Sequence, residues 1–169
     1  MPHEPGNMNN DAPLLDAALA DFIQHHVSIN VATRDAANRP TLTRALGCRV
    51  SPDRRRVTLF ISVPRSEELL RDLRANGTIA VVFSRPTTHQ TIQLKAGDAA
   101  IVALEDGDRA LMAAYGASFV EEIRQIGYRD PFASAMVSAL DEDAVGVVFT
   151  PTAAFVQTPG PAAGQPLRS

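Results

Sequence analysis

The sequence has little from which to build a disulfide framework or a metal cluster. Cys48 is the only cysteine among 169 residues, so an intramolecular disulfide and a four-cysteine metal site are both excluded. Its flanks in the run ALGCRV are largely apolar, and we interpret Cys48 as a structural thiol rather than a nucleophile. A single thiol is compatible with a reducing compartment.

Signals for export and for membrane insertion are also missing. Residues 1–12 have no basic segment followed by an apolar one, so they do not resemble a signal peptide. No apolar run approaches the ~20 residues that a membrane-spanning helix needs. The net charge of −3 gives no positive field to recruit nucleic acid or an acidic membrane. We therefore expect a cytoplasmic protein with neither nucleic acid nor a membrane as its partner.

The short motifs that place catalytic groups are absent as well. The chain has no G-x-S-x-G nucleophile elbow, no phosphate-binding Walker loop, no G-x-G-x-x-G and no H-E-x-x-H. His25 and His26 are adjacent and would point about 100° apart on a helix, so they do not chelate one ion together. We therefore name no catalytic residue and expect no metal site.

The sequence does contain enough apolar material for one core. Hydrophobic residues make up 45% of the chain and charged residues 21%, which is typical of a globular domain. Residues 1–12 are rich in Pro, Asn and Gly and are predicted to form a flexible arm. Residues 158–169 form a Pro/Gly-rich tail. A single domain over residues 13–157 is the simplest organisation.

Strand-like segments dominate this domain. Residues 27–33 alternate apolar and polar side chains, as in a half-buried strand. Residues 78–84 are continuously apolar, which implies burial on both faces. We expect a bend or bulge at Gly47, at residues 95–97 and at Pro151. The six expected strands are residues 27–33, 41–50, 57–63, 78–84, 90–104 and 144–156, and they predict an antiparallel barrel with peripheral helices.

Helical patterns lie between the strands. A helix within residues 13–26 is expected to have Asp11 as its N-cap, and a longer helix starting at Asp106 is expected to end near Gly127. A short helix is expected within residues 131–140. The apolar stripe of the longer helix is interpreted as core and consists of Leu111, Met112, Tyr115, Phe119, Ile123 and Ile126.

The strongest physical candidate for a binding site is an anion site at another helix, which starts at Ser66 and is closed by Gly77. Its first turn offers free backbone N–H groups and the positive end of the helix dipole. Arg65 precedes this turn, and Arg44 from a neighbouring strand can reach the same place. Two arginines beside a helix N-terminus suit a phosphate monoester. From the spacing alone, the simpler alternative is preferred: a solvated Arg65 and a Ser66 that only caps the helix.

The order of strands and helices favours a binding site over this simpler alternative. Residues 57–97, VTLFISVPRSEELLRDLRANGTIAVVFSRPTTHQTIQLKAG, and the closing segment AVGVVFTPTAAFVQTPGPAAG resemble the pyridoxamine 5′-phosphate oxidase-related, FMN-binding split-barrel family. The likeness extends over residues 20–104 and the last strand. It implies a mainly β (α+β) fold, a six-stranded antiparallel split β-barrel with peripheral helices. It also implies a homodimer with FMN at the subunit interface.

The same resemblance assigns cofactor-binding positions. Arg44, Ala45, Leu46 and Gly47 correspond to the strand that holds the flavin phosphate and ring edge, Ser62 and Val63 to the strand beside the isoalloxazine, and His89, Gln90 and Thr91 to a turn with a polar flavin contact. Arg65 and Ser66 complete the set as the candidate phosphate seat.

The chain departs from the family in two places. The oxidases carry an Arg-Lys pair at the start of the short helix, where this chain has Glu68 and Leu69. The C-terminal segment QPLRS also lacks an arginine and histidine pair for pyridoxamine phosphate, so true pyridoxamine phosphate oxidase activity is not expected. The leading hypothesis is an FMN-dependent oxidoreductase that acts on a small molecule or electron donor.

Alternatives from the same resemblance stay open. One is a flavin-binding module without turnover, and another is a deazaflavin protein. A third is a haem-binding module, for which the candidate axial ligands are His25, His26 and His89.

Overall fold

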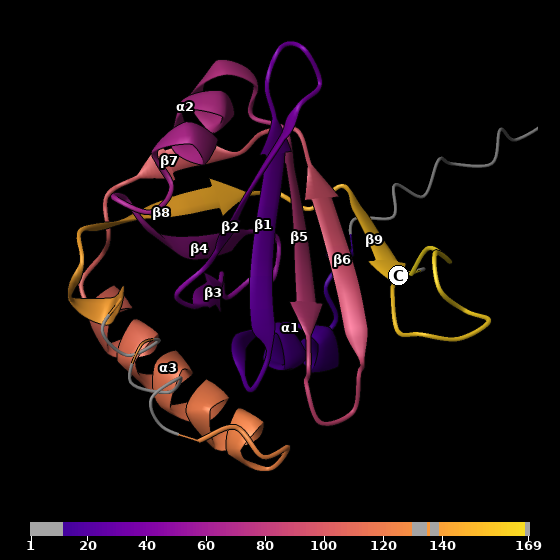
Figure 1. The fold of residues 1–169 in the computed structure, drawn as a ribbon. Helices are drawn as coiled ribbons and strands as arrows, with labels where there is room; N and C mark the ends of the chain where they lie inside the picture. Colours follow the sequence, from indigo (N-terminus) through magenta and orange to yellow (C-terminus); the bar gives the residue numbers. More distant parts are fainter. Residues whose placement is uncertain (1–11, 130–134, 136–138, 168–169) are drawn as a thin grey trace, which may run out of the picture.

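The computed structural model describes residues 12–129, 135 and 139–167, in which nine strands form two antiparallel sheets beside three α-helices (Figure 1). The larger sheet has the order β2-β1-β5-β6-β9 and the smaller one the order β3-β4-β8-β7. The helices are α1 (Ala17–Gln24), α2 (Glu67–Asn76), α3 (Asp108–Arg124) and the short 3₁₀ helix η1 (Ala139–Asp141). The strands are β1 (Ser28–Arg34), β2 (Pro40–Arg44), β3 (Cys48–Val50), β4 (Val57–Ser62), β5 (Ile79–Ser84), β6 (Thr91–Ala96), β7 (Ala100–Val102), β8 (Ala144–Phe149) and β9 (Ala153–Val156).

Nine strands replace the six expected ones because three of the expected strands break and pass from one sheet to the other. Residues 41–50 form β2 and β3, residues 90–104 form β6 and β7, and residues 144–156 form β8 and β9. Gly47 lies at the first break with φ of +128°, and Pro151, which has no N–H for a ladder, lies at the third. The bends were expected at these places, but they end a strand rather than bulge it. The described residues thus form two sheets joined at corners, not one closed barrel.

The two central strands differ in how they are buried. β4 is buried along its whole length between β3 and β8. In β5 only alternate residues are buried, namely Ile79, Val81 and Phe83, whereas Ala80 and Val82 are half-buried on the other face. The expectation that residues 78–84 are buried on both faces is therefore wrong for the single chain. An apolar run such as residues 78–84 is compatible with burial of both faces of the strand. Whether a second layer of the protein covers the other face is decided only by tertiary packing.

The helix starts also differ from those expected. Asp16 caps α1 by accepting a hydrogen bond from Leu19 N at 2.7 Å, whereas Asp11 lies outside the described residues. The N-cap of α3 is Gly107 rather than Asp106, because the chain turns there with φ of +92°. On α3 the central part of the apolar stripe is buried as expected, but Leu111 is exposed, and so is Ile126, which lies past the end of the helix at Arg124. The helix expected within residues 131–140 falls mostly outside the described residues.

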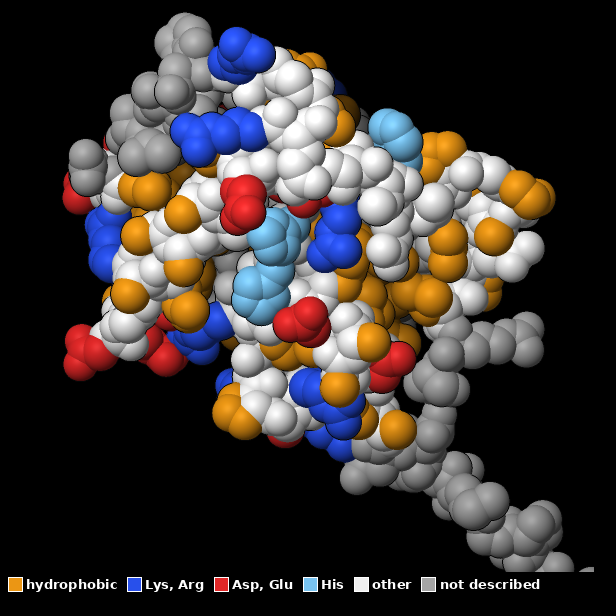
Figure 2. All heavy atoms as spheres, turned by 90° about the horizontal axis from the view of Figure 1, so that it is seen from below, with side chains coloured by type: hydrophobic (Ala, Val, Ile, Leu, Met, Phe, Trp, Pro, Cys, Tyr) orange, Lys and Arg blue, Asp and Glu red, His pale blue; other side chains and the backbone are white. Residues whose placement is uncertain are grey.

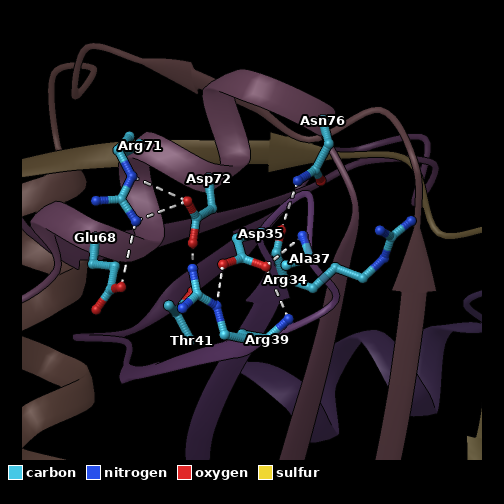
Figure 3. Close-up of polar contacts among 9 residues, drawn as sticks. All are labelled: Arg34, Asp35, Ala37, Arg39, Thr41, Glu68, Arg71, Asp72 and Asn76. Atoms are coloured by element: carbon cyan, nitrogen blue, oxygen red, sulfur yellow. Dashed lines mark hydrogen bonds and ion pairs between the residues drawn. The ribbon is translucent and has the colours of Figure 1, made fainter.

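Polar contacts fix α2 onto the β1–β2 hairpin (Figure 3). Asn76 Nδ2 donates to the carbonyl oxygen of Arg34 at 2.7 Å. The hydroxyl of Thr41 donates to the buried carboxylate of Asp72 at 3.4 Å. The hairpin turn itself is held by Asp35, whose carboxylate accepts backbone N–H groups within the loop. Because α2 is held at this hairpin, the start of α2 lies beside the end of β2.

No helix among the described residues is long and apolar enough to cross a membrane.

Cys48 is buried, and its thiol donates to the carbonyl oxygen of Ile23 at 3.3 Å. Burial raises the pKa of this thiol strongly, so Cys48 stays protonated. Its interpretation as a structural thiol agrees with this environment.

Candidate functional site

A cavity of about 390 Å³ opens where the β2–β3 corner, the end of β4 and α3 meet. We call it the Arg44 pocket. Its described lining residues are Thr43, Arg44, Ala45, Leu46, Ser62, Arg65, Tyr115, Gly116, Ala135, Ala139 and Leu140. The lining combines two guanidinium groups, two hydroxyls and a phenol with apolar side chains. This composition suits an organic ligand that carries an anionic group.

Arg44 contributes buried donors that have no acceptor within the described protein. Its Nε and Nη2 atoms are both buried and make no hydrogen bond. The guanidinium lies over the ring of Phe119, with Cζ 4.5 Å from the ring centroid. Stacking on Phe119 holds the group in place but leaves its in-plane N–H groups unpaired. Buried unpaired donors are costly, so this arrangement is typical of a site that accepts an anionic ligand.

Tyr115 adds a third unpaired polar atom to the same pocket. Its hydroxyl oxygen is buried and has no hydrogen-bond partner in the described chain. Burial raises the pKa of Tyr115 to about 12, although the positive charge of Arg44 opposes this shift. The phenol therefore stays protonated at neutral pH and can donate a hydrogen bond to a ligand.

Arg65 and Ser62 are already engaged with an acidic side chain. Glu142, just after η1, accepts hydrogen bonds from Arg65 Nη2 at 2.6 Å and from Arg65 Nε at 2.8 Å. The hydroxyl of Ser62 donates to Glu142 Oε2 at 2.5 Å. These contacts lower the pKa of the Glu142 carboxyl below its ordinary value, first through Arg65 and then through Ser62. Glu142 is therefore a carboxylate at neutral pH.

The stability due to this contact is expected to depend on pH. Glu142→Gln should lower the free energy of unfolding at neutral pH, and the loss should shrink as the pH falls below the ordinary carboxyl pKa of 4.5. A carboxyl whose pKa is depressed by folding stabilises the protein above its unfolded-state pKa and loses this effect as the pH falls through its folded-state pKa. Urea unfolding of both proteins from neutral to acidic pH measures the difference. A difference that stays constant on acidification would contradict the ion pair.

Ser66 does not cap α2. It lies at the N-cap position but makes no side-chain cap hydrogen bond. Instead, its buried hydroxyl pairs with the hydroxyl of Thr43 at 2.7 Å. The expected N-cap role is wrong because a partner on β2 competes for the hydroxyl. The contact instead ties the start of α2 to the strand that carries Arg44.

The position of the missing Arg-Lys pair stays outside the pocket. Glu68 is exposed on α2 and pairs with Arg71 at 3.4 Å, while Leu69 is buried in the core. Neither side chain lines the Arg44 pocket. The cations of this pocket are Arg44 from β2 and Arg65 from the loop before α2.

The structure brings together only part of the cofactor-binding set expected from the resemblance. Arg44, Ala45, Leu46, Ser62 and Arg65 line the Arg44 pocket, and Gly47 packs against Tyr115 at its edge. Val63 is half-buried beside the pocket, and its N–H donates to the carbonyl oxygen of Asp143 at 2.8 Å.

His89, Gln90 and Thr91 do not line the Arg44 pocket within one chain. His89 and Gln90 lie in the turn between β5 and β6, and Thr91 begins β6, where its hydroxyl pairs with that of Ser84 at 2.8 Å. Gln90 borders a different cavity, of about 450 Å³, beside α1. Residues that would share one ligand are thus separated in the single chain.

Sequence reasoning missed Glu142, which binds Arg65, and six lining residues of the Arg44 pocket, namely Thr43, Tyr115, Gly116, Ala135, Ala139 and Leu140. Tyr115 lies on the apolar stripe of α3 and was expected to be core, which is correct for its ring but not for its hydroxyl. Glu142 belongs to an acidic turn far along the chain. Only the contacts of Glu142 and Asp143 with Ser62 and Val63 at the end of β4 bring it to Arg65, 77 residues away.

The described histidines, His25, His26 and His89, do not line the Arg44 pocket. The His25 side chain is 55% exposed, and its Nδ1 lies 3.0 Å from the carbonyl oxygen of Asp21. His26 Nδ1 lies 3.1 Å from the carbonyl oxygen of Ser118. Figure 2 views this end of the molecule, where histidines lie among acidic and arginine side chains at the surface. Among the residues that the structure describes, no group of three or more His, Cys, Asp and Glu side chains is arranged to hold a metal ion.

Comparison with solved structures shows which fold this is. HupZ from Group A Streptococcus superimposes with a TM-score of 0.54 and 17% sequence identity, over 89% of this chain and 99% of that one. A proposed pyridoxamine 5′-phosphate oxidase from Lactobacillus delbrueckii superimposes with a TM-score of 0.52 and 14% identity, over 87% and 97% of the two chains. No family model and no curated protein sequence matches this chain. At these identities the likeness shows a shared fold.

Proposed function

Because this chain has the split-barrel fold of the pyridoxamine 5′-phosphate oxidase-like proteins, we propose that it binds FMN in the Arg44 pocket and acts as a flavin-dependent oxidoreductase. The observation that carries the proposal is the pair of buried, unpartnered guanidinium atoms of Arg44. A phosphate monoester supplies the acceptor oxygens and negative charge that these donors lack.

The residues present fit a flavin phosphate. Arg44 and the Tyr115 phenol supply buried donors that have no partner in the described protein and that a phosphate could satisfy. Arg65 and Ser62 add further donors once their contact with Glu142 is released. Ala45 and Leu46 supply the apolar part of the lining. The pocket thus combines an anion-binding end with an apolar surface.

FMN when bound supplies hydride and electron transfer, and the protein supplies binding, orientation and electrostatic tuning. In this division of labour, Arg44 holds the phosphate end, and the β2–β3 corner fixes the orientation. No side-chain acid or base is needed for such transfer, and we assign none. The substrate is proposed to be a small molecule or an electron donor.

We also propose that two copies of the chain form the complete site. Leu42 on β2 is 70% exposed, and Ala80 and Val82 form a half-buried apolar strip on the same face of the larger sheet. A second copy on this face would bury that strip. It would also allow His89, Gln90 and Thr91 of one chain to approach the FMN held by the other. The measurement is the mass of the purified protein in solution.

Binding of FMN is tested directly by titration. The protein is expected to quench flavin fluorescence at a stoichiometry of one FMN per chain. Riboflavin lacks the phosphate and should bind about 100-fold more weakly, since hydrogen bonds to charged groups contribute about 1.5–3 kcal/mol each. Equal affinity for FMN and riboflavin would contradict the proposal that Arg44 binds the phosphate of FMN. A folded protein that takes up neither flavin would refute the proposal.

A flavin-binding module without turnover is the alternative, since the Arg44 pocket would hold FMN in the same way in both cases. Reduction of the bound FMN by a nicotinamide, followed by reoxidation with an acceptor, distinguishes the enzyme from the module. An absorption spectrum after addition of haem, with the His25, His26 and His89 variants, tests the haem-binding form of the alternative.

A further inference from the structure

One carboxylate beside the Arg44 pocket, that of Glu142, has no role in the binding proposed above. Glu142 occupies the bidentate face of Arg65 and the hydroxyl of Ser62. These are the donor types that a phosphate oxygen uses. An internal anion thus lies on groups that an anionic ligand would need.

The backbone beneath this carboxylate is anchored on both sides. Arg109 on α3 donates through Nη1 to the carbonyl oxygens of Leu140 and Glu142, at 2.9 and 3.0 Å. The carbonyl oxygen of Asp143 accepts from Val63 N at 2.8 Å. The Glu142 side chain itself is 26% exposed. The side chain can therefore rotate into water while its backbone stays in place.

The charges around the Arg44 pocket determine which ligand can displace the Glu142 carboxylate from Arg65 and Ser62. Arg44 and Arg65 carry two positive charges, and Glu142 offsets one of them. A phosphate monoester carries about −1.5 to −2 charges at neutral pH and three acceptor oxygens, so it can satisfy both guanidinium groups. A ligand with a single carboxylate would only replace the Glu142 carboxylate on Arg65 by another carboxylate, with no gain in charge. It must also compete with an attached side chain, whose effective concentration is in the millimolar range.

We infer that Glu142 is a specificity-determining residue of the Arg44 pocket, which yields Arg65 and Ser62 to a dianionic phosphate group and withholds them from ligands with a single carboxylate. The inference rests on the proposed function in that it concerns the same pocket. It adds a rule for ligand selection. The exchange breaks the Arg65–Glu142 ion pair and forms an Arg65–phosphate pair, with no covalent change.

The test uses inorganic phosphate and acetate as probes and Glu142→Gln as the variant. Glutamine keeps the size of the side chain and can still accept from Ser62, but it removes the charge that competes for Arg65. The variant is expected to bind phosphate about 10-fold more tightly than the wild type, in line with the loss of one exposed ion pair and its local competition. Acetate should bind measurably only to the variant. Calorimetric titration measures both.

Glu121→Gln is the matched control. Glu121 is exposed on α3 and does not line the pocket, and its replacement changes the net charge equally. This control variant should bind phosphate and acetate as the wild type does. Equal phosphate affinities in Glu142→Gln and Glu121→Gln would overturn the inference and leave Glu142 as a structural tie between β4 and η1. Absence of phosphate binding in all three proteins would overturn it too.

The outcome is separable from that of the FMN titration. Tighter phosphate binding by Glu142→Gln together with no FMN binding would retain the Glu142 inference and refute the FMN proposal. FMN binding together with an unchanged phosphate affinity in Glu142→Gln would retain the FMN proposal and refute the Glu142 inference.

Discussion

Arg44→Met is expected to lower the affinity for FMN by about 100-fold, since the lost hydrogen bonds to a charged phosphate contribute about 1.5–3 kcal/mol each. Methionine keeps the unbranched apolar part of the side chain, but it removes the guanidinium, whose Nε and Nη2 are buried and unpaired and whose Cζ lies over Phe119. The same replacement should leave riboflavin binding nearly unchanged, because riboflavin offers no phosphate. Fluorescence titration with the two flavins measures both affinities.

The ligand-free protein should respond in the opposite direction. Burying an unpaired donor costs about 1–3 kcal/mol, and the cation–π contact returns about 0.5–2 kcal/mol, so Arg44→Met is expected to maintain or raise the unfolding temperature. A binding site that is strained without its ligand behaves in this way. Arg74→Met is the matched control. It removes the same charge at the exposed last turn of α2, and it should change neither the affinity for FMN nor that for riboflavin. Arg44→Met with full FMN affinity would place the phosphate elsewhere.

Gly47→Ala is expected to destabilise the protein by about 2–6 kcal/mol, the sum of backbone strain and overpacking. Gly47 has φ of +128°, a conformation that side chains rarely adopt. A Cβ there would lie 3.1 Å from Tyr115 Cβ and 3.3 Å from Phe60 Cδ2. Both neighbours are buried, so neither can move away without disturbing the corner between β2 and β3.

Gly97→Ala provides the matched control, since Gly97 lies at the corner between β6 and β7. Its φ lies outside the positive range, and a Cβ there would meet no atom within 4 Å. The change in unfolding free energy is expected to stay within about 0.5 kcal/mol. Urea unfolding of both variants measures the difference. Equal effects of the two replacements would show that Gly47 is not constrained by its backbone and its neighbours.

The alternation along residues 27–33 was predictable because it needs only the period of a strand. Ile29 and Val31 are buried, and Ser28 and Asn30 are half-buried, as the pattern indicates. The left-handed cap at Gly77 was predictable for a similar reason, since its φ of +67° is a local property of the chain. Local geometry of this kind is contained in a few neighbouring residues.

The role of Ser66 could not be predicted in the same way. Its hydroxyl has a local choice, the first turn of α2, and a distant one, the hydroxyl of Thr43. The sequence shows the first and not the second. Similarly, the pattern predicted bends at Gly47 and Pro151, but not that the chain leaves one sheet for the other at these bends.

The sequence by itself determined the positions of the bends and the faces of most strands and helices, and its family resemblance predicted Arg44 as a phosphate contact. Only the tertiary structure decided that Arg44 stacks on Phe119 with unpaired donors, that the Tyr115 hydroxyl joins it, and that Glu142 occupies Arg65. These contacts join segments up to 80 residues apart, as in the pair of Ser62 and Glu142. Such pairs follow from the packing of α3 and η1 against the sheet corner, and no local pattern in the sequence encodes that packing.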